Sequence, residues 1–561
     1  MKRFVIIWVC ILNLLLFSCQ KSKDNYYRIS VKEYIDKAKA AWIGQMVGVG
    51  WGASTEFKYI FKIMPQHEIP VWNDSMVNQY FQDDLYVEMT FLRTLEKYGL
   101  DVSTKQAGID FANSTYGLAC ANETGRENLR AGIAPPESGH PDFGFSSDDI
   151  DYQIEADYSG IISPGLPNSV IHLGEKFGKI MNYGDGVYGG QFMGGMYAAA
   201  FFEKNIKKIV EAGLKCIPEK SDYAQCVRDV MNWYSMDSMN WKNTWTLIDN
   251  KYRKDSTYQK LAVKNRKSWP GIDAKLNGAF VVLGLLYGKG NLDSTICISM
   301  RAGLDSDCNP SSAAGVLFTS IGLDKLPEKF KAKLDFQTMF SNTEYNFNSL
   351  NAVCEKLARN VILKNGGLIE KDNNGEEYFY IPKTAVVCSA LEQSYNAKAA
   401  NKTNLYTKSE MKLILVHPSK VFQPVLDVVA KGWRAGNCGK TIEPGFVQHR
   451  GRKNVLAIIA PNENTACYLS KDIEMSKGKN AKLKFWVSCG DDQEWILDIY
   501  IQWKKEKSIV INDEFCIKGW KEIVFDLKEY SERGKLFMQL DGRAGKNGLC
   551  KTYWDKIRVE Y

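Results

Sequence analysis

Apolar residues recur at helical spacing from about residue 31 to residue 360. This periodicity predicts helices over residues 31–52, 85–98, 189–202, 277–287 and 311–321. In the first of these, Gly44, Gly48 and Gly52 recur every four residues, which makes one face smooth enough for close helix packing. Asn309, followed by proline, is the expected N-cap of the last one. This part of the chain is therefore expected to be a helical domain.

The stretch between the second and third predicted helices, residues 122–186, is rich in glycine, proline and aspartate. It is predicted to form a long loop. Loops of such length inside compact domains are usually functional, so this stretch is a candidate source of substrate contacts.

The pattern changes after about residue 365. A mixed segment, with one predicted strand over 413–417, extends to about residue 432. From Trp433 onward, short runs of alternating apolar and polar residues are separated by turn signals such as Gly490-Asp491. These runs predict an antiparallel β-sandwich with strands over 482–487, 495–503, 523–527 and 556–561.

Length and composition are those of a multidomain globular protein. The 561 residues exceed the size at which a single core keeps growing. Hydrophobic residues make up 45% of the chain and charged residues 24%, which is ordinary. The net charge of +7 is spread without a long basic run, so nucleic-acid binding is not expected.

The N-terminus predicts export. Two basic residues precede an apolar run over 4–17, which is short for a membrane span and typical of a signal-peptide core. Leu16, Ser18 and Cys19 resemble a bacterial lipobox, in which the cysteine is lipidated and becomes the mature N-terminus. We predict a signal peptide over 1–19 and a lipid anchor at Cys19, in the periplasm or at the cell surface. The alternative, an uncleaved N-terminal anchor, also tethers the chain to a membrane.

Cysteines beyond this segment are scattered singly. Cys216 and Cys226 are close enough in sequence for a local disulfide, which an exported setting permits. The chain has no Cys-x-x-Cys motif and its five histidines are dispersed, so a zinc site is not expected.

Two groups of closely spaced carboxylates stand at predicted helix starts. Asp83 and Asp84 precede the second helix, and Asp305 and Asp307 precede the fifth. Aspartates at such positions often only cap free N–H groups or form turns. If the two groups meet in space, they form a cage for hard cations such as Mg²⁺, which prefer carboxylate oxygens. Spacing alone leaves both interpretations open.

Three motifs in order make residues 31–360 resemble the ADP-ribosylglycohydrolase family. They are the glycine-rich helix that runs to Glu56, the run Gln82-Asp83-Asp84, and the run Arg301-Ala302-Gly303-Leu304-Asp305-Ser306-Asp307 before a helix of small residues. The resemblance implies an all-helical fold with a binuclear metal site. In it, one or two Mg²⁺ ions, or Mn²⁺ in their place, are held by Asp83, Asp84, Asp305 and Asp307.

The chain departs from the family beside each aspartate pair, where relatives commonly carry threonine. Here the neighbours are Gln82 and Leu85 on one side and Cys308 on the other. A neutral thiol is a poor ligand for a hard cation. Gln82 and Cys308 are candidate members of the metal shell, and the second metal position is weaker, rebuilt with Gln82 or water, or empty.

The resemblance further implies hydrolysis of a glycosidic bond at a furanose-like sugar. A carboxylate outside the cage would act as general base or stabilise positive charge at the anomeric carbon. Glu56 and Asp157 are the candidates for this catalytic role, although Glu56 also suits a surface or capping position. Tyr188 and Gly189 are predicted to shape the sugar pocket, while backbone permissiveness explains the glycine equally well.

The C-terminal sandwich resembles a galactose-binding-like or carbohydrate-binding module. The resemblance rests on the strand pattern, the closing Trp554-Asp555-Lys556-Ile557 and several tryptophans. Trp486 and Trp495 lie in alternating strands, so they either stack on sugars or belong to the core.

These observations predict a multidomain protein, with an all-α ADP-ribosylglycohydrolase-like domain followed by an antiparallel β-sandwich. The predicted parts are the signal peptide 1–19, a catalytic domain 31–360, a connecting region 361–430 and an accessory sandwich 431–561. The predicted function is that of an exported, lipid-anchored, Mg²⁺-dependent glycosidase. Its expected partners are a membrane and a glycan or glycoside with a furanose-like sugar in an N- or O-glycosidic bond. The alternatives are a hydrolase that removes ADP-ribose from an acceptor and a non-catalytic glycan-binding lipoprotein.

Overall fold

The computed structural model describes residues 25–144, 146–255, 272–415, 426, 429–436, 442–460, 466–475, 480–532, 534–545 and 550–561. The predicted signal peptide, with Cys19, lies outside these residues. The described residues fall into two compact units. One is drawn from Met1–Val102, Asp148–Gly178 and Gly184–Tyr395, and the other from Ser103–Ser147, Lys179–Tyr183 and Asn396–Tyr561. The domain limits predicted from the sequence stay predictions.

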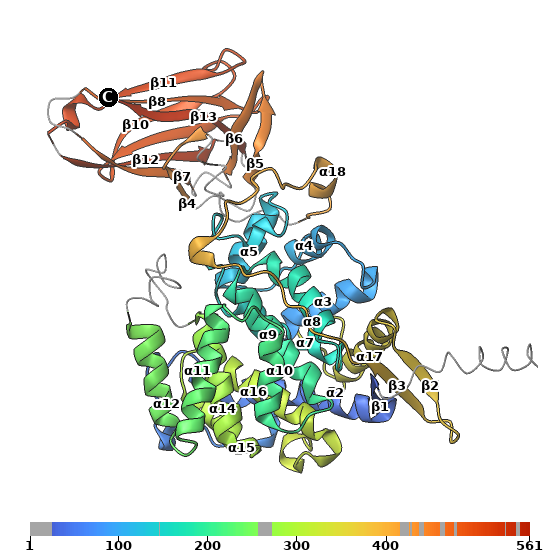
Figure 1. Ribbon diagram of the computed structural model, residues 1–561. Coiled ribbons are helices and arrows are strands. Elements are labelled where there is room, and N and C mark those ends of the chain that lie inside the picture. The colour runs from blue at the N-terminus through green and yellow to red at the C-terminus, as the bar shows by residue number, and fades with distance from the viewer. Residues whose placement is uncertain are drawn as a thin grey trace, which may run out of the picture. The chain divides into compact units, whose positions relative to one another are not determined.

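The first unit is built mainly of α-helices (Figure 1). They are α2 (Val31–Gly52), α3 (Asp83–Tyr98), α6 (Asp151–Ile154), α7 (Asp157–Ile161), α8 (Pro167–Phe177), α9 (Asp185–Ala200), α10 (Ile206–Lys215), α11 (Asp222–Met236), α12 (Trp241–Ile248), α14 (Ala274–Gly288), α15 (Leu292–Arg301), α16 (Cys308–Ile321) and α17 (Phe347–Lys364). A small antiparallel sheet that the periodicity did not predict has the order β1-β3-β2, from Tyr26–Ser30, Glu377–Pro382 and Leu368–Lys371. The second unit adds α4 (Thr104–Ala112), α5 (Cys120–Arg130) and α18 (Lys408–Met411).

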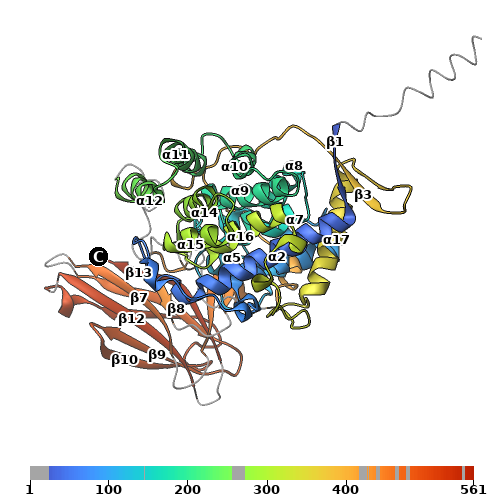
Figure 2. The ribbon, with the colours of Figure 1, turned by 90° about the horizontal axis from the view of Figure 1, so that it is seen from below.

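Helix α16 lies in the core of the first unit. It contacts α2, α9, α14 and α15 (Figure 2). Every residue from Cys308 to Ser320 is buried, in keeping with a sequence that is apolar or small nearly all round. A helix surrounded in this way places its N-terminal loop deep in the unit.

Three glycines let α2 pack directly on the backbone of α16 and the loop before it. A Cβ atom at Gly44 would lie 2.6 Å from the carbonyl oxygen of Ala314, and one at Gly48 would lie 2.3 Å from the backbone of Ser311. At Gly52 it would lie 2.3 Å from the carbonyl oxygen of Ser306. The four-residue spacing read from the sequence therefore forms a helix-packing face, as predicted.

Several boundaries differ from the predicted ones. Helix α3 begins at Asp83, so both of its aspartates belong to the first turn. Helix α16 begins at Cys308, with Asp307 at the N-cap position, so the predicted cap at Asn309 is wrong. The reason is that the N–H of Asn309 already donates to the carbonyl of Asp305, 3.1 Å away, as part of the helical ladder.

The long loop predicted over 122–186 is also wrong, because α6, α7 and α8 lie within it. Helix α8 starts at Pro167, a residue whose fixed φ suits the first turn. The polar composition of this stretch reflects short helices with turns between them.

Two smaller predictions fail as well. Cys216 and Cys226 are free, buried cysteines whose thiols face the carbonyls of Ala212 and Lys275, at 3.5 and 3.7 Å. They form no disulfide because each thiol points to a backbone acceptor and not to the other. Of the strand predicted over 413–417, the described residues 413–415 are not in a strand.

The C-terminal part of the second unit consists of two five-stranded antiparallel sheets, in the orders β10-β9-β12-β7-β4 and β11-β8-β13-β6-β5. Their strands are β4 (Arg434–Gly436), β5 (Ile442–His449), β6 (Arg452–Ala460), β7 (Cys467–Glu474), β8 (Lys482–Cys489), β9 (Trp495–Ile501), β10 (Lys504–Ile511), β11 (Lys521–Asp526), β12 (Lys535–Ala544) and β13 (Cys550–Glu560). The predicted class, a helical domain followed by an antiparallel sandwich, is confirmed.

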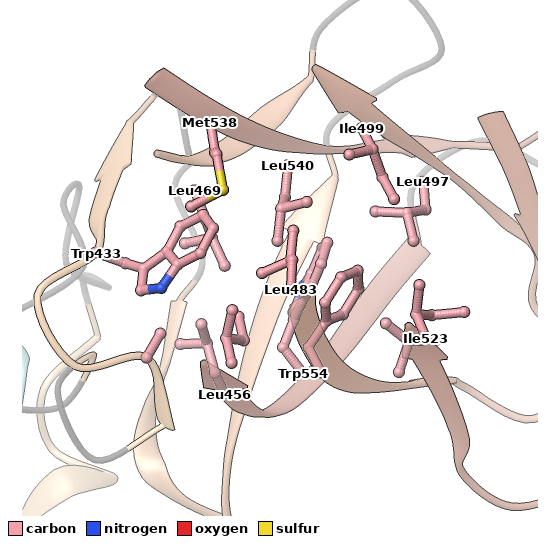
Figure 3. Packing of buried hydrophobic residues seen from close by; sticks show 14 of the residues in the cluster. Trp433, Leu456, Leu469, Leu483, Leu497, Ile499, Ile523, Met538, Leu540 and Trp554 are labelled. Carbon is pink, nitrogen blue, oxygen red and sulfur yellow. The ribbon is translucent and has the colours of Figure 1, made fainter. Parts of the chain in front are cut away.

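Alternation along these strands separates a packed core from the outer faces. Figure 3 shows Leu483, Met538 and Trp554 pointing into the core between the sheets. Trp495 belongs to this core. Trp486 lies on the opposite side of β8, half-buried, with the guanidinium of Arg452 4.1 Å from its ring centre.

The structure also bears on membrane contact. Among the described residues, no helix combines the length and the apolar character needed to cross a bilayer.

Replacing Gly48 by alanine tests the close contact between α2 and α16. The added methyl group would collide with backbone atoms, so we expect the free energy of unfolding to fall by about 1–3 kcal/mol. Denaturant unfolding followed by circular dichroism measures this. Gly117→Ala is the matched control, since Gly117 is exposed and an added Cβ there has no atom within 4 Å. Equal stability of the two variants would contradict the packing argument.

Candidate functional site

The loop that carries Asp305 and Asp307 has a constrained backbone. Gly303 and Leu304 both adopt left-handed conformations, with φ of 82° and 60°. A Cβ at Gly303 would lie 2.2 Å from the carbonyl oxygen of Tyr59, so only glycine fits there. This turn directs the following aspartates toward the interior, where both are buried.

The same loop is tied to the segment that carries Glu56. The N–H of Phe57 donates to the carbonyl of Leu304 at 3.2 Å, and the hydroxyls of Thr55 and Ser306 are 2.8 Å apart. Asn277 of α14 supports the other side, because its side-chain oxygen accepts the N–H of Asp305 at 3.3 Å. The first and third sequence motifs are thus joined through backbone and hydroxyl contacts.

The first turn of α3 brings the second carboxylate pair to this loop. Asp84 is buried, and its Oδ1 accepts a hydrogen bond from the Cys308 thiol at 3.0 Å. The same sulfur lies 3.8 Å from Oδ1 of Asp307. The two aspartate groups, which are far apart in sequence, therefore meet around one thiol; sequence spacing alone left this open.

Crowding and burial disfavour the charged forms of these carboxylates. Burial raises the pKa of Asp305 to about 7, even though hydrogen bonding to Asp307 acts in the other direction. Burial, and then the charge of Asp305, raises the pKa of Asp307 well above its ordinary value. Burial raises the pKa of Asp84 in the same way, with Asp83 and Asp307 adding to it. The pKa of Asp83 is also raised by burial, although N–H groups of the first turn of α3 partly offset it.

The donor set fits a divalent cation. Within the described residues, Oδ2 of Asp84 and Oδ1 of Asp305 are buried and have no hydrogen-bond partner. One ligand atom each from Asp305, Asp307 and Cys308 lies within 4.8 Å of the others. Buried carboxylate oxygens without donors are costly unless a proton or a cation neutralises them. This arrangement can hold a metal ion.

Glu56 lies at the rim of the cluster. Its residue is exposed, unlike the aspartates. Partial removal from water, followed by the charges of Asp307 and Asp83, raises the pKa of Glu56 to about 7. A carboxylate with such a pKa can accept a proton near neutral pH.

Asp157 was predicted to lie in a loop. It lies instead in the first turn of α7, where it is 1% exposed. Its Oδ2 accepts the hydroxyl of Tyr197 at 2.7 Å. Burial raises the pKa of Asp157 to about 8. A group so enclosed does not face solvent.

Glu88 is a residue that the sequence reasoning missed. It is fully buried on α3, and its Oε2 accepts the N–H of Tyr158 at 2.7 Å. Burial, followed by the charges of Asp157 and Asp84, raises the pKa of Glu88 well above its ordinary value. The signal was available, since Glu88 follows Asp84 by four residues and so shares its helix face. Glu88 and Asp157 are thus buried carboxylates near Asp84, which is one of the metal-site candidates.

The remaining predicted site residues have other contacts. Gln82 occupies the N-cap position of α3 without a side-chain cap bond. Tyr188 is buried, and its hydroxyl donates to the carbonyl of Ala390 at 2.9 Å and accepts the N–H of Glu392 at 2.6 Å. A Cβ at Gly189 would lie 2.7 Å from Oε1 of Gln153, which indicates close packing. Tyr188 and Gly189 thus hold chain segments together, and their role in a sugar pocket stays a prediction.

Comparison with known proteins identifies the helical region. The model of the ADP-ribosylglycohydrolase family matches residues 30–365. The chain belongs to the ADP-ribosylglycohydrolase family. Membership indicates a hydrolase, and it confirms the resemblance seen in the three sequence motifs. No match was found among curated proteins.

Solved structures resemble each part of the chain at low similarity. An ADP-ribosylglycohydrolase-related protein complex has 12% identity and a TM-score of 0.37, covering 59% of this chain and 99% of that one. TmCBM61 in complex with β-1,4-galactotriose has 16% identity and a TM-score of 0.16, covering 23% and 83%. The carbohydrate-binding module CBM28, specific for non-crystalline cellulose, has 14% identity and a TM-score of 0.20, covering 26% and 93%.

The raised pKa values of the buried aspartates predict how the stability of metal-free protein depends on pH. The folded-state pKa values of Asp305 and Asp157, about 7 and about 8, exceed the ordinary aspartate value. Folding therefore favours their protonated forms, and this stability is lost as pH rises from about 4 to about 8. In EDTA we expect Tm to fall between pH 5 and pH 8.

A cation that replaces these protons should act mainly at high pH. We expect Mg²⁺ or Mn²⁺ to raise Tm by several degrees at pH 8 and by less at pH 5. Thermal unfolding by differential scanning fluorimetry measures both effects. In Asp305→Asn the pH dependence should be smaller. A Tm that changes with neither pH nor added cation would contradict the inference that the buried aspartates require protons or a cation.

Proposed function

We propose that this member of the ADP-ribosylglycohydrolase family is a Mg²⁺-dependent glycosidase that hydrolyses the glycosidic bond of a furanose-like sugar. The observation that supports this most is the meeting of two aspartate groups with unpartnered buried oxygens beside Glu56, whose pKa is about 7. Mn²⁺ is the expected substitute for Mg²⁺. Family membership supports the hydrolase class, and the metal and the substrate are part of the proposal.

Asp83, Asp84, Asp305 and Asp307 would hold the cation. When bound there, it would supply Lewis acidity and coordination for sugar hydroxyls. Oδ2 of Asp84 and Oδ1 of Asp305 are the oxygens available for it. The rigid turn at Gly303 keeps both aspartates of the loop in place.

Glu56 is the proposed general base. It is the exposed carboxylate of the group, so a substrate and a water molecule can reach it. At neutral pH a large share of it is ionised, and an ionised carboxylate accepts the proton of the attacking water. The bond to the anomeric carbon then breaks, and the leaving group takes up a proton from water.

Asp157 is assigned a supporting role in place of direct contact with the substrate. It is enclosed, and it accepts the hydroxyl of Tyr197. Asp157 and Glu88 are buried carboxylates near Asp84, and burial raises the pKa of both, so each favours its protonated form at neutral pH and adds little repulsion to Asp84.

The proposed setting favours an extracellular glycoside. A signal peptide and a lipid anchor at Cys19 would place the enzyme outside the cytoplasm. Glycans are the abundant glycosides in that setting. Removal of ADP-ribose from an acceptor is the second candidate, supported by the family.

One observation favours glycan binding by the sandwich. Trp503 is 72% exposed and stacks on Phe537, with ring centres 4.2 Å apart. It lies in the β9–β10 turn, where Gln502 and Trp503 have φ of 50° and 67°, values that glycine and asparagine adopt more easily. A bulky aromatic residue at a strained, exposed turn points to a binding role. A non-catalytic glycan-binding lipoprotein remains the alternative for the whole chain.

Turnover of a panel of nitrophenyl furanosides, nitrophenyl pyranosides and ADP-ribosylated peptides tests the proposed activity. We expect hydrolysis of a furanoside that requires Mg²⁺ or Mn²⁺ and stops in EDTA. Asp305→Asn should lower kcat/KM by about 100-fold, because it removes one ligand charge. The matched control is Asp293→Asn, a half-buried aspartate outside the site that is paired with Lys329 at 2.6 Å. Absence of turnover together with absence of cation binding would favour the non-catalytic alternative.

Trp503→Gly tests glycan binding without the risk of unfolding. The change removes the exposed ring and also relieves the strain of the positive φ, so stability should be kept or improved. Affinity electrophoresis in galactan, β-glucan, xylan and mannan should show retardation of the wild type and about tenfold weaker binding of the variant. Ile517→Ala, at a position 81% exposed, is the control. Equal retardation of all three proteins would contradict this role for Trp503.

A further inference from the structure

Cys308 occupies the junction of the two aspartate groups. It is the first residue of α16, follows Asp307 directly and is 4% exposed. Its sulfur lies 3.0 Å from Oδ1 of Asp84 on the other helix entrance. No other position in the described chain brings a thiol into a set of His, Cys, Asp and Glu ligand atoms close enough for one metal ion.

The surroundings of the Cys308 thiol differ from those of the buried Cys216 and Cys226. The thiols of Cys216 and Cys226 face backbone carbonyls, which are ordinary acceptors for a buried S–H. Cys308 instead faces two carboxylates, those of Asp84 and Asp307. An apolar environment alone would explain the first two cysteines but not the third.

A second observation indicates that a cation belongs beside this sulfur. Oδ2 of Asp84 and Oδ1 of Asp305 are buried and have no partner among the described residues. Both carboxylates also lie close to Cys308, because Oδ1 of Asp84 is 3.0 Å from its sulfur and a ligand oxygen of Asp305 is within 4.8 Å of it. The sulfur and the unpartnered oxygens thus belong to one cluster that lacks a positive charge of its own.

Oxygen and sulfur ligands select different cations. Carboxylates alone suit Mg²⁺, whereas a sulfur ligand strengthens binding of Zn²⁺ and Co²⁺ and adds little for Mg²⁺. Threonine, common at this position in the family, offers a second hard oxygen. Sequence motifs gave no reason to expect zinc, because the chain has no Cys-x-x-Cys motif and its histidines are dispersed.

We propose that Cys308 makes this site selective for thiophilic divalent cations, such as Zn²⁺ and Co²⁺, over Mg²⁺. The inference rests on the proposed metal site and names the class of cation it prefers. Binding replaces the S–H bond by a sulfur–metal bond, and the proton leaves to solvent, so no oxidant or reductant takes part. Asp84 exchanges its hydrogen bond from the thiol for the charge of the cation.

Cobalt titration of the full-length, metal-free protein in detergent tests the proposal. Sulfur bound to Co²⁺ produces a charge-transfer absorption in the near ultraviolet, which is independent of enzymatic activity. We expect the wild type and Cys388→Ser, a control at an exposed free cysteine, to show this band, and Cys308→Ser to lack it. Competition with Mg²⁺ should show that Cys308→Thr lowers the preference for Co²⁺ by at least about tenfold.

The outcomes separate this inference from the metal site on which it rests. If wild type, Cys308→Ser and Cys308→Thr bind Co²⁺ with equal affinity and equal spectra, the selectivity role of Cys308 is overturned while the site stands. If Asp305→Asn binds Co²⁺ and Mg²⁺ as tightly as the wild type, the metal site itself fails, and the inference with it. Circular dichroism of each variant shows whether it is folded. Two substitutions at position 308 are used so that the test can still be made if one of the two variants does not fold.

Discussion

The direct backbone contact between α2 and α16 is the constraint on which the rest of the site depends. Gly44, Gly48 and Gly52 carry no side chain at that contact, and the end of α2 then lies on the carbonyl of Ser306. Because the metal-site loop is the entrance to α16, the same contact that packs two helices also positions two carboxylates. Glu56 follows α2 by four residues, so the packing of α2 on α16 also positions Glu56 at the rim of the site.

The site is arranged against the normal preference of charges for water. Asp84, Asp305 and Asp307 are buried together, and Glu88 and Asp157 are buried near Asp84. Few donors face them apart from the Cys308 thiol, the Tyr197 hydroxyl and the N–H of Tyr158. Such a cluster is stable only with bound protons or with a cation. Rigid neighbours hold it in place, since relaxation would otherwise separate the charges.

The two sheets of the C-terminal sandwich are stabilised by other means. An alternating pattern places one side of strands such as β8, β9 and β12 in a core that includes Trp433, Trp495 and Trp554. Trp486 and Trp503 lie outside this core. Trp486 is covered by Arg452, whereas Trp503 is held at an exposed turn by Phe537. This difference in cover, and not residue type, distinguishes a packed tryptophan from a candidate for binding.

The sequence by itself determined the features that depend on local periodicity and on short motifs. The helical spacing of 31–52, the alternation after Trp433 and the three family motifs were sufficient for the fold class. These patterns also identified Asp83, Asp84, Asp305 and Asp307 as candidate ligands, because carboxylates at helix starts can be recognised from the sequence alone. The four-residue spacing placed Glu88 on the same helix face as Asp84, but it did not reveal the burial of Glu88 or the enclosure of Asp157 in α7.

Tertiary structure alone decided which of these residues meet. The contact of Cys308 with Asp84 joins positions from two distant helices, and no spacing rule encodes it. The hydrogen bonds from Tyr188 to Ala390 and Glu392 likewise join distant segments, while the predicted role of Tyr188 in a sugar pocket stays a prediction. The physical reason is that periodicity reports which face of an element is buried, whereas contacts across elements depend on how their backbones pack.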